Sequence, residues 1–170
     1  DMSTKFYGNG NVKPVKKTES HGTHVAGIIA AERNNGKGAN GVANNVEIMS
    51  VRAVPNGDEY DKDVALAIRY AVDNGAKVIN GSFGKSYSPH SDWVRDAIAY
   101  AGKKDVVFVH AAGNDSNDID TKANYPDDNV NGQEVSDTYI RVGALAPKYG
   151  SGMVAGFSNY GKSNVDVFAP

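Results

Sequence analysis

Short apolar runs rich in β-branched residues alternate along this chain with segments of helical period. The runs cover residues 46–54, 77–83, 105–110 and 139–145. Such alternation is typical of βαβ units, in which parallel strands are covered by helices. The runs are almost continuously apolar, as expected of strands buried on both faces. The sequence therefore predicts a three-layer α/β fold: a mostly parallel sheet with helices on both faces.

Two helices are predicted between these strands. Residues 63–74 carry acidic residues at their start, with Gly75 just past their end. Residues 91–104 have Ser91 as the expected N-cap and lysines at their end. The apolar stripes are Val64, Ala67, Ile68, Ala71 and Val72 in the first helix, and Trp93, Val94, Ala97, Ile98 and Ala101 in the second. Residues 6–18 and 115–136, rich in Asn, Asp and Gly, are predicted surface loops.

Composition excludes several classes of function. The chain has 170 residues, enough for one domain with a core of its own. Its 18 Lys and Arg against 20 Asp and Glu leave a net charge of -2, so neither a nucleic acid nor an anionic membrane is an expected partner. No apolar stretch approaches the roughly 20 residues that span a bilayer. Without cysteine, disulfides, thiolate zinc sites and cysteine nucleophiles are excluded.

A string with two histidines, HGTHVAG at residues 21–27, follows Ser20, a good N-cap, and begins another predicted helix. His21 is expected in the first turn beside Gly22, which leaves room for a substrate backbone to approach. An accessible histidine there can act as a general base. His24 leads the apolar stripe and is interpreted as structural. A zinc site is not favoured, because a third ligand and the H-E-x-x-H pattern are missing.

Two predicted strands end in small and polar residues. Residues 109–114 read VHAAGN, so Asn114 emerges at the carboxyl end of a strand, where α/β sheets bind ligands. An asparagine amide there is a neutral donor suited to a developing oxyanion. Residues 80–84 read NGSFG and end the preceding strand, where backbone groups can pair with an extended peptide.

In chain order, the strings HGTHVAG (21–27), VINGSFG (78–84), AAGN (111–114), FSNYG (157–161) and VFAP (167–170) resemble those of the subtilisin-like serine proteases, the subtilases of peptidase family S8. The resemblance implies a subtilisin-like fold and a serine endopeptidase acting on peptides or proteins. It implies that His21 is the general base and Asn114 the oxyanion donor. It also implies a substrate-binding set: Ser82, Phe83 and Gly84 pairing with the substrate backbone, Gly57 in the opposing loop, and Ala111, Ala112 and Gly113 as one wall of the pocket for the residue before the cleaved bond.

Two members of the family's triad have no counterpart here. The triad runs Asp, His, Ser along the chain. The serine of the family lies in a G-T-S-M-A-x-P string after the Ala-Pro, and its aspartate in a D-[ST]-G context that Asp1 does not match. We therefore expect residues 1–170 to be an internal part of a catalytic domain, inactive alone, because loss of the serine costs subtilisin ~2 × 10⁶ in kcat. Unpaired strand edges would favour self-association.

The family often binds calcium in the loop after the histidine helix. Here residues 34–40 read NNGKGAN, with Lys37 and no carboxylate, in a loop that looks one residue too long. A glycine-rich surface loop is the favoured interpretation. No cofactor is predicted for this chain, and calcium binding by the parent protein stays an open alternative. A secreted or cell-envelope location is implied by the family alone.

Two alternatives remain open. Residues 81–84 (GSFG) approach the G-x-S-x-G nucleophile elbow of α/β-hydrolases, but that motif needs glycine at Asn80 and a histidine late in the chain. The later histidines, His90 and His110, come too early for that order. The second alternative is a protease-like domain that binds peptides without cleaving them.

Overall fold

A computed structural model describes residues 10–16, 18–54 and 57–170. The chain divides into two compact units, a sheet unit formed mainly by Ala53–Pro170 and an N-terminal helical unit formed by Gly8–Arg52. The helical unit contains α1 (His21–Ala30). The sheet unit contains α2 (Asp61–Asp73), β1 (Val78–Gly81), α3 (Ser91–Lys103), β2 (Val107–Ala111), β3 (Asn129–Val130), β4 (Gln133–Glu134), β5 (Tyr139–Ala144), a 3₁₀ turn (Gly150–Gly152) and β6 (Val167–Ala169).

The main sheet has four strands in the order β1-β2-β5-β6, and every neighbouring pair is parallel. In register, Gly81 lies opposite His110, His110 opposite Arg141, and Gly143 opposite Phe168. β3 and β4 form a separate antiparallel hairpin. The predicted parallel α/β sheet is confirmed, and the strands at residues 77–83, 105–110 and 139–145 are shorter or shifted by a few residues.

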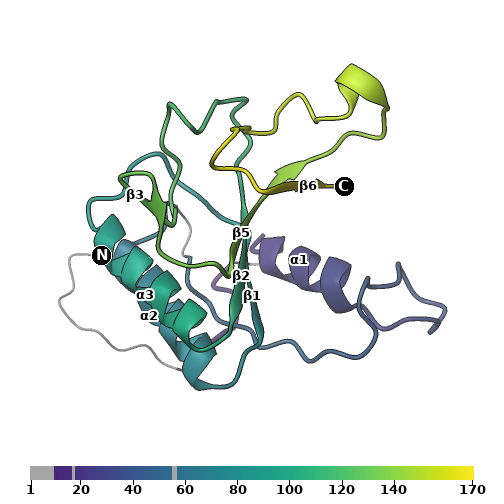
Figure 1. Cartoon of the computed structure of the whole chain (residues 1–170). Helices are drawn as coiled ribbons and strands as arrows, with labels where there is room; N and C mark the ends of the chain where they lie inside the picture. The colour runs from purple at the N-terminus through teal and green to yellow at the C-terminus, as the bar shows by residue number, and fades with distance from the viewer. Residues whose placement is uncertain (1–9, 17, 55–56) are drawn as a thin grey trace. The chain divides into compact units, whose positions relative to one another are not determined.

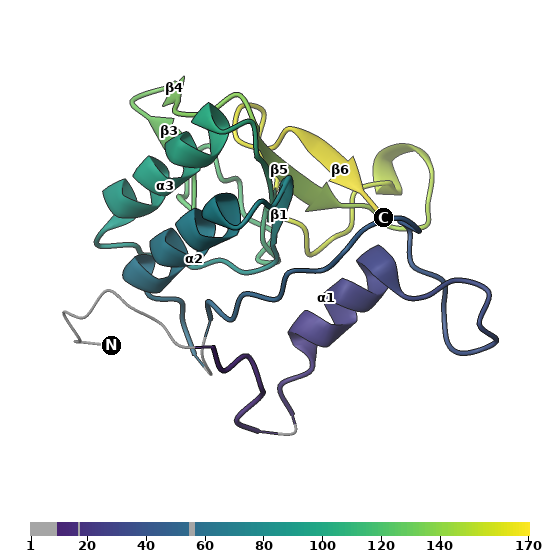
Figure 2. The ribbon, with the colours of Figure 1, turned by 90° about the horizontal axis from the view of Figure 1, so that it is seen from below.

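Helices α2 and α3 lie side by side on one face of the sheet (Figures 1 and 2). Their apolar stripes pack against the side chains of β1, β2 and β5 that point to this face, including Phe108 and Tyr139. The predicted stripes are confirmed with two changes. In α2, Ala65, which is not in the predicted stripe, is buried, whereas the predicted Ala67 is only half-buried. In α3, Trp93 is 38% exposed and its ring stacks on His90. The helix layer on the other face of the sheet stays a prediction.

One predicted N-cap is confirmed in position, and the other is shifted by one residue. Ser91 is the first residue of α3, with His90 in the cap position, and the Ser91 hydroxyl accepts a hydrogen bond from Arg95 instead. Ser20 does occupy the cap position of α1, but its side chain makes no capping hydrogen bond. Its backbone carbonyl accepts the first helical bond, from the His24 N–H.

The predicted strand at residues 46–54 is wrong, because these residues join no sheet in the described part of the chain. Val46, Ile48 and Met49 are about half exposed. A β-rich composition alone does not form a strand, because a strand also needs a neighbour to complete its backbone hydrogen bonds.

The loop at residues 115–136 is confirmed in outline but contains the β3–β4 hairpin and the buried Ile119. Of the predicted loop at residues 6–18, residues 6–9 and 17 lie outside the described residues.

Candidate active site

The carboxyl ends of β1 and β2 bring together two predicted groups of site residues. The two strands are parallel neighbours, so the segments that follow them emerge at the same edge of the sheet. Ser82, Phe83 and Gly84 follow β1, while Ala111 ends β2 and leads into the loop that carries Asn114. Asn114 is exposed at that edge.

The orientation of the Phe83 carbonyl defines which backbone groups of this segment face outward. This carbonyl accepts a hydrogen bond from His110 Nε2 at 2.8 Å, so it points inward, toward β2. Lys85 also faces inward, since its N–H and C=O pair with Tyr125 at 2.9 and 2.8 Å. Successive residues of an extended chain point their backbone groups to opposite sides. The backbone groups of Ser82 and Gly84 therefore face away from β2, and β1 is the terminal strand of this sheet.

The loop after β2 turns at a glycine that the structure requires. Gly113 has φ +106°, and a Cβ there would collide with the side-chain amides of Asn124 and Asn159. Both amides donate to the Ala112 carbonyl, at 2.6 and 2.9 Å. Ala112 itself is buried in a small cluster with Ile119 and Val165, so its methyl group faces the interior.

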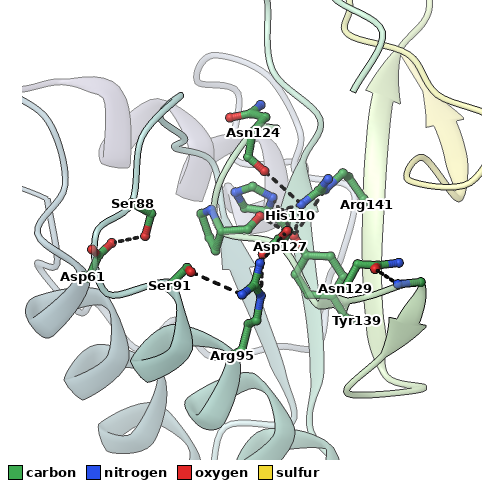
Figure 3. A network of polar contacts seen from close by, with 12 residues as sticks. Asp61, Ser88, Ser91, Arg95, His110, Asn124, Asp127, Asn129, Tyr139 and Arg141 are labelled. Atoms are coloured by element: carbon green, nitrogen blue, oxygen red, sulfur yellow. Dashed lines mark hydrogen bonds and ion pairs between the residues drawn. The ribbon is translucent and has the colours of Figure 1, made fainter. Parts of the chain in front are cut away.

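A buried polar network lies behind the Phe83 segment (Figure 3). His110 is 1% exposed, and its Nδ1 lies 2.9 Å from the Tyr139 hydroxyl. The Arg141 guanidinium donates to that hydroxyl at 3.1 and 3.3 Å and to the Pro126 carbonyl at 2.6 Å. It also reaches the Asn124 carbonyl at 3.3 Å. The network thus joins the segment after β1 to residues 124–126.

The protonation of this network follows from its partners. Burial and, after it, the nearby Arg141 charge lower the pKa of His110 to about 3, so the imidazole is neutral at physiological pH. A neutral imidazole has one N–H, and the Phe83 carbonyl can only accept, so the proton is on Nε2. Nδ1 must then accept from the Tyr139 hydroxyl, whose pKa is raised chiefly by burial.

Ion pairs fix the segments on either side of this edge (Figure 3). Asp61, the first residue of α2, pairs with Lys85 at 2.7 Å and accepts from the Ser88 hydroxyl at 2.6 Å. Burial raises the pKa of Asp61, but these donors outweigh it and the net shift is downward. Arg95 holds Asp127 through two hydrogen bonds of 2.8 and 3.0 Å. The segment after β1 and the segment around Asp127 are thus each tied to a helix.

In the N-terminal helical unit, His21 is the first residue of α1 and is exposed. A Cβ at Gly22 would meet nothing within 4 Å, as expected if Gly22 leaves room beside His21. His24 is also exposed, so the structure does not support the interpretation of His24 as a structural residue. In the sheet unit, Gly57 is exposed with φ +137°, a conformation that favours glycine.

The loop at residues 34–40 is exposed and uses its own amide oxygens internally. Asn40 Oδ1 accepts from the Asn34 N–H at 3.0 Å, and Asn35 Oδ1 accepts from the Lys37 N–H at 2.9 Å. These oxygens are engaged by backbone donors, in keeping with a surface loop. In the described part of the chain, no group of three or more His, Cys, Asp or Glu side chains is arranged to hold a metal ion.

The hydrolase-elbow alternative finds no support at Ser82. Its hydroxyl accepts from the Asn80 amide at 2.9 Å. His110, which contacts the neighbouring Phe83, has both ring nitrogens engaged, one by Phe83 and one by Tyr139. A nucleophilic serine requires a base within hydrogen-bond reach.

The Subtilase family model matches residues 3–170, which is nearly the whole chain. The chain belongs to the subtilase family. This subtilase chain is 43% identical over 153 residues to the thermophilic serine proteinase of Bacillus sp. (strain AK1), covering 89% of this chain and 34% of that protein. It is 37% identical over 172 residues to the cell wall-associated protease of Bacillus subtilis (strain 168), covering 100% of this chain and 17% of that protein.

A solved protease of Pseudoalteromonas arctica PAMC 21717 superposes on this subtilase chain with a TM-score of 0.73 and 38% identity, covering 88% of this chain and 43% of the other. The psychrophilic subtilisin-like protease Apa1 of Pseudoalteromonas sp. AS-11 superposes with a TM-score of 0.73 and 30% identity, covering 95% of this chain and 34% of the other, and this likeness confirms the predicted subtilisin-like fold. The chain thus spans about a third or less of the two curated relatives and under half of either solved protease.

The sequence interpretation assigned no role to four residues that shape the candidate edge: Asn124, Tyr139, Asn159 and Arg141. A signal existed for Asn159, since it lies inside the FSNYG string of the resemblance. A polar side chain in the apolar strand β2, at His110, was a second signal of a buried network. Nothing in the local sequence indicated that Arg141 would be buried.

Proposed function

We propose that this chain supplies the general base, the oxyanion donor and the peptide-pairing edge of a subtilisin-type serine endopeptidase. The observation that carries the proposal is the exposed Asn114 at the same sheet edge as the outward backbone groups of Ser82 and Gly84, in a chain of the subtilase family. An extended substrate would pair with that edge and present its scissile carbonyl to the amide.

His21 takes the proton of the serine nucleophile in this proposal and returns it to the leaving amine. Ala111 and Gly113 line the pocket for the residue before the cleaved bond, with Ala112 as backing, and Gly57 lies on the opposing side of the substrate. The mechanism requires His21 and Asn114 to act on one peptide bond. The nucleophile and the orienting aspartate would come from coding sequence adjoining residues 1–170, and the native enzyme would act at the cell surface or outside the cell.

The test is hydrolysis of a fluorogenic peptide by the protein expressed from the complete reading frame. Wild type should cleave it and react with a fluorophosphonate, and His21→Ala should abolish turnover. Asn114→Ala should lower kcat by about 10²–10³-fold, a magnitude measured on subtilisin. Unchanged kcat in either variant would refute the assigned roles.

The 170-residue polypeptide by itself should hydrolyse neither casein nor a peptide ester, because it contains no G-T-S-M-A-x-P string. Turnover that His21→Ala removes would contradict this. A second candidate function, peptide binding without cleavage, rests on the outward edge at Ser82 and Gly84, which needs no nucleophile. A residue other than serine at the nucleophile position of the complete reading frame would favour it.

A further inference from the structure

The loop that carries Asn114 is held from both sides by one buried side chain, that of Asn159. Asn159 is 1% exposed. Ahead of Asn114, its Nδ2 donates to the Ala112 carbonyl at 2.9 Å and its backbone N–H donates to the Gly113 carbonyl at 2.9 Å. Beyond Asn114, its Oδ1 accepts from the N–H groups of Asp115 and Asn117, both at 3.0 Å.

Asn114 has no comparable restraint of its own. Its side chain is exposed and makes no hydrogen bond with the residues that the structure describes. The direction of its amide therefore depends on the backbone of residues 112–117. Oxyanion stabilisation depends strongly on donor placement, because an amide displaced by an ångström no longer meets the developing charge.

The rest of the 156–160 segment reinforces this arrangement. The Ser116 N–H donates to the Phe157 carbonyl at 3.0 Å, and the Ser116 hydroxyl donates to the Gly156 carbonyl at 2.7 Å. The Tyr160 N–H donates to the Asn117 carbonyl at 3.0 Å. Of these contacts, only those of Asn159 lie on both sides of Asn114 and are made by one fully buried amide.

We propose that Asn159 is a positioning residue for the oxyanion donor Asn114, acting through the backbone of residues 112–117. The inference rests on the proposed function, in which Asn114 stabilises the oxyanion. Asn159 touches neither substrate nor the reacting atoms, and its contribution should appear in kcat, not in KM.

The first experiment measures amide hydrogen exchange by NMR in the 170-residue chain and does not depend on activity. Asn159→Ala should speed exchange of the Asp115 and Asn117 amides at least tenfold, while β2 amides keep their protection. Asn164→Ala is the matched control, because that asparagine bonds Asp120 instead.

Unchanged exchange at Asp115 and Asn117 in Asn159→Ala would overturn the proposal. If Asn159→Ala also loses the protection of β2, the comparison passes to Asn159→Leu, which keeps the buried volume. The same selective loss there supports the proposal, and its absence overturns it.

The second experiment uses a double-mutant cycle in the protease expressed from the complete reading frame. Asn159→Ala should lower kcat about tenfold with KM unchanged, and should add no further loss to Asn114→Ala, because it acts through that residue. Equal losses in both backgrounds would mean a merely structural role and refute the positioning role. If Asn114→Ala leaves kcat unchanged, the proposed function fails instead, and the exchange result still stands.

Discussion

The free energy of unfolding should fall as the pH drops below about 6.5, and His110 should be a main cause. Its pKa is lowered to about 3 in the folded protein by burial and by the Arg141 charge, against 6.5 when unfolded. For a base whose folded pKa is lowered, the stability is complete above the unfolded pKa and is lost as the pH falls toward the folded one. The sensitive window is therefore pH 6.5 to 3.

The size of this effect follows from the two pKa values. Each pH unit between them costs about 1.4 kcal/mol, so moving from pH 7 to pH 4 should cost roughly 3 kcal/mol. His110→Gln removes the titration while its amide can still donate to the Phe83 carbonyl. The Tyr139 hydroxyl then has a second acceptor, the Pro126 carbonyl at 2.9 Å, so the variant need not leave it unpaired.

Urea unfolding followed by the fluorescence of Trp93, the single tryptophan, measures both proteins at pH 7 and pH 4. His110→Gln should be less stable than wild type at pH 7, and the gap should shrink or reverse at pH 4. The difference between the proteins isolates His110 from other titrating groups. A gap that stays constant between the two pH values would refute the reasoning.

Three further substitutions test the packing and electrostatics of the sheet unit. Ile98→Ala should lower the unfolding free energy by about 2–5 kcal/mol in urea titrations, because Ile98 is fully buried in the main core. Gly143→Ala should cost about 1–3 kcal/mol, since a Cβ there collides with the Phe168 ring, whereas Gly156→Ala meets nothing and should leave the Tm nearly unchanged. Burial and, after it, the Glu134 charge raise the pKa of Asp128 from 3.8 to about 6, so its ionisation costs the folded protein stability as the pH rises from about 4 to 6. Asp128→Asn removes that cost and should be stabilising at pH 7, by up to roughly 3 kcal/mol, and not at pH 4; equal effects at both would contradict the assignment.

The parts of the fold that local patterns determine were predictable from the sequence. The stripes of α2 and α3 follow from helical spacing, and the apolar strands β2 and β5 from β-branched runs with turn residues at their ends. Residues 46–54 carry the same kind of pattern but form no strand, because a strand also needs a neighbour with which to pair its backbone groups.

The candidate site was predictable where it follows strand ends and not where it depends on distant contacts. Asn114 and Ser82–Gly84 lie where the strand pattern placed them. The amides of Asn124 and Asn159, which meet at the Ala112 carbonyl, come from segments 12 and 47 residues away. Short-range periodicity in the sequence does not predict such contacts between distant residues.

The parallel order of the sheet has a consequence for how the chain folds. Val78 pairs with Val107, Phe108 with Tyr139, and Val142 with Val167, so each ladder joins residues separated by roughly 25 to 31 positions. A long loop must close before any of these ladders forms, and its entropy is lost before the contacts compensate for it. The sheet unit should therefore have a high contact order and fold over milliseconds to seconds, far more slowly than a helical bundle of the same length.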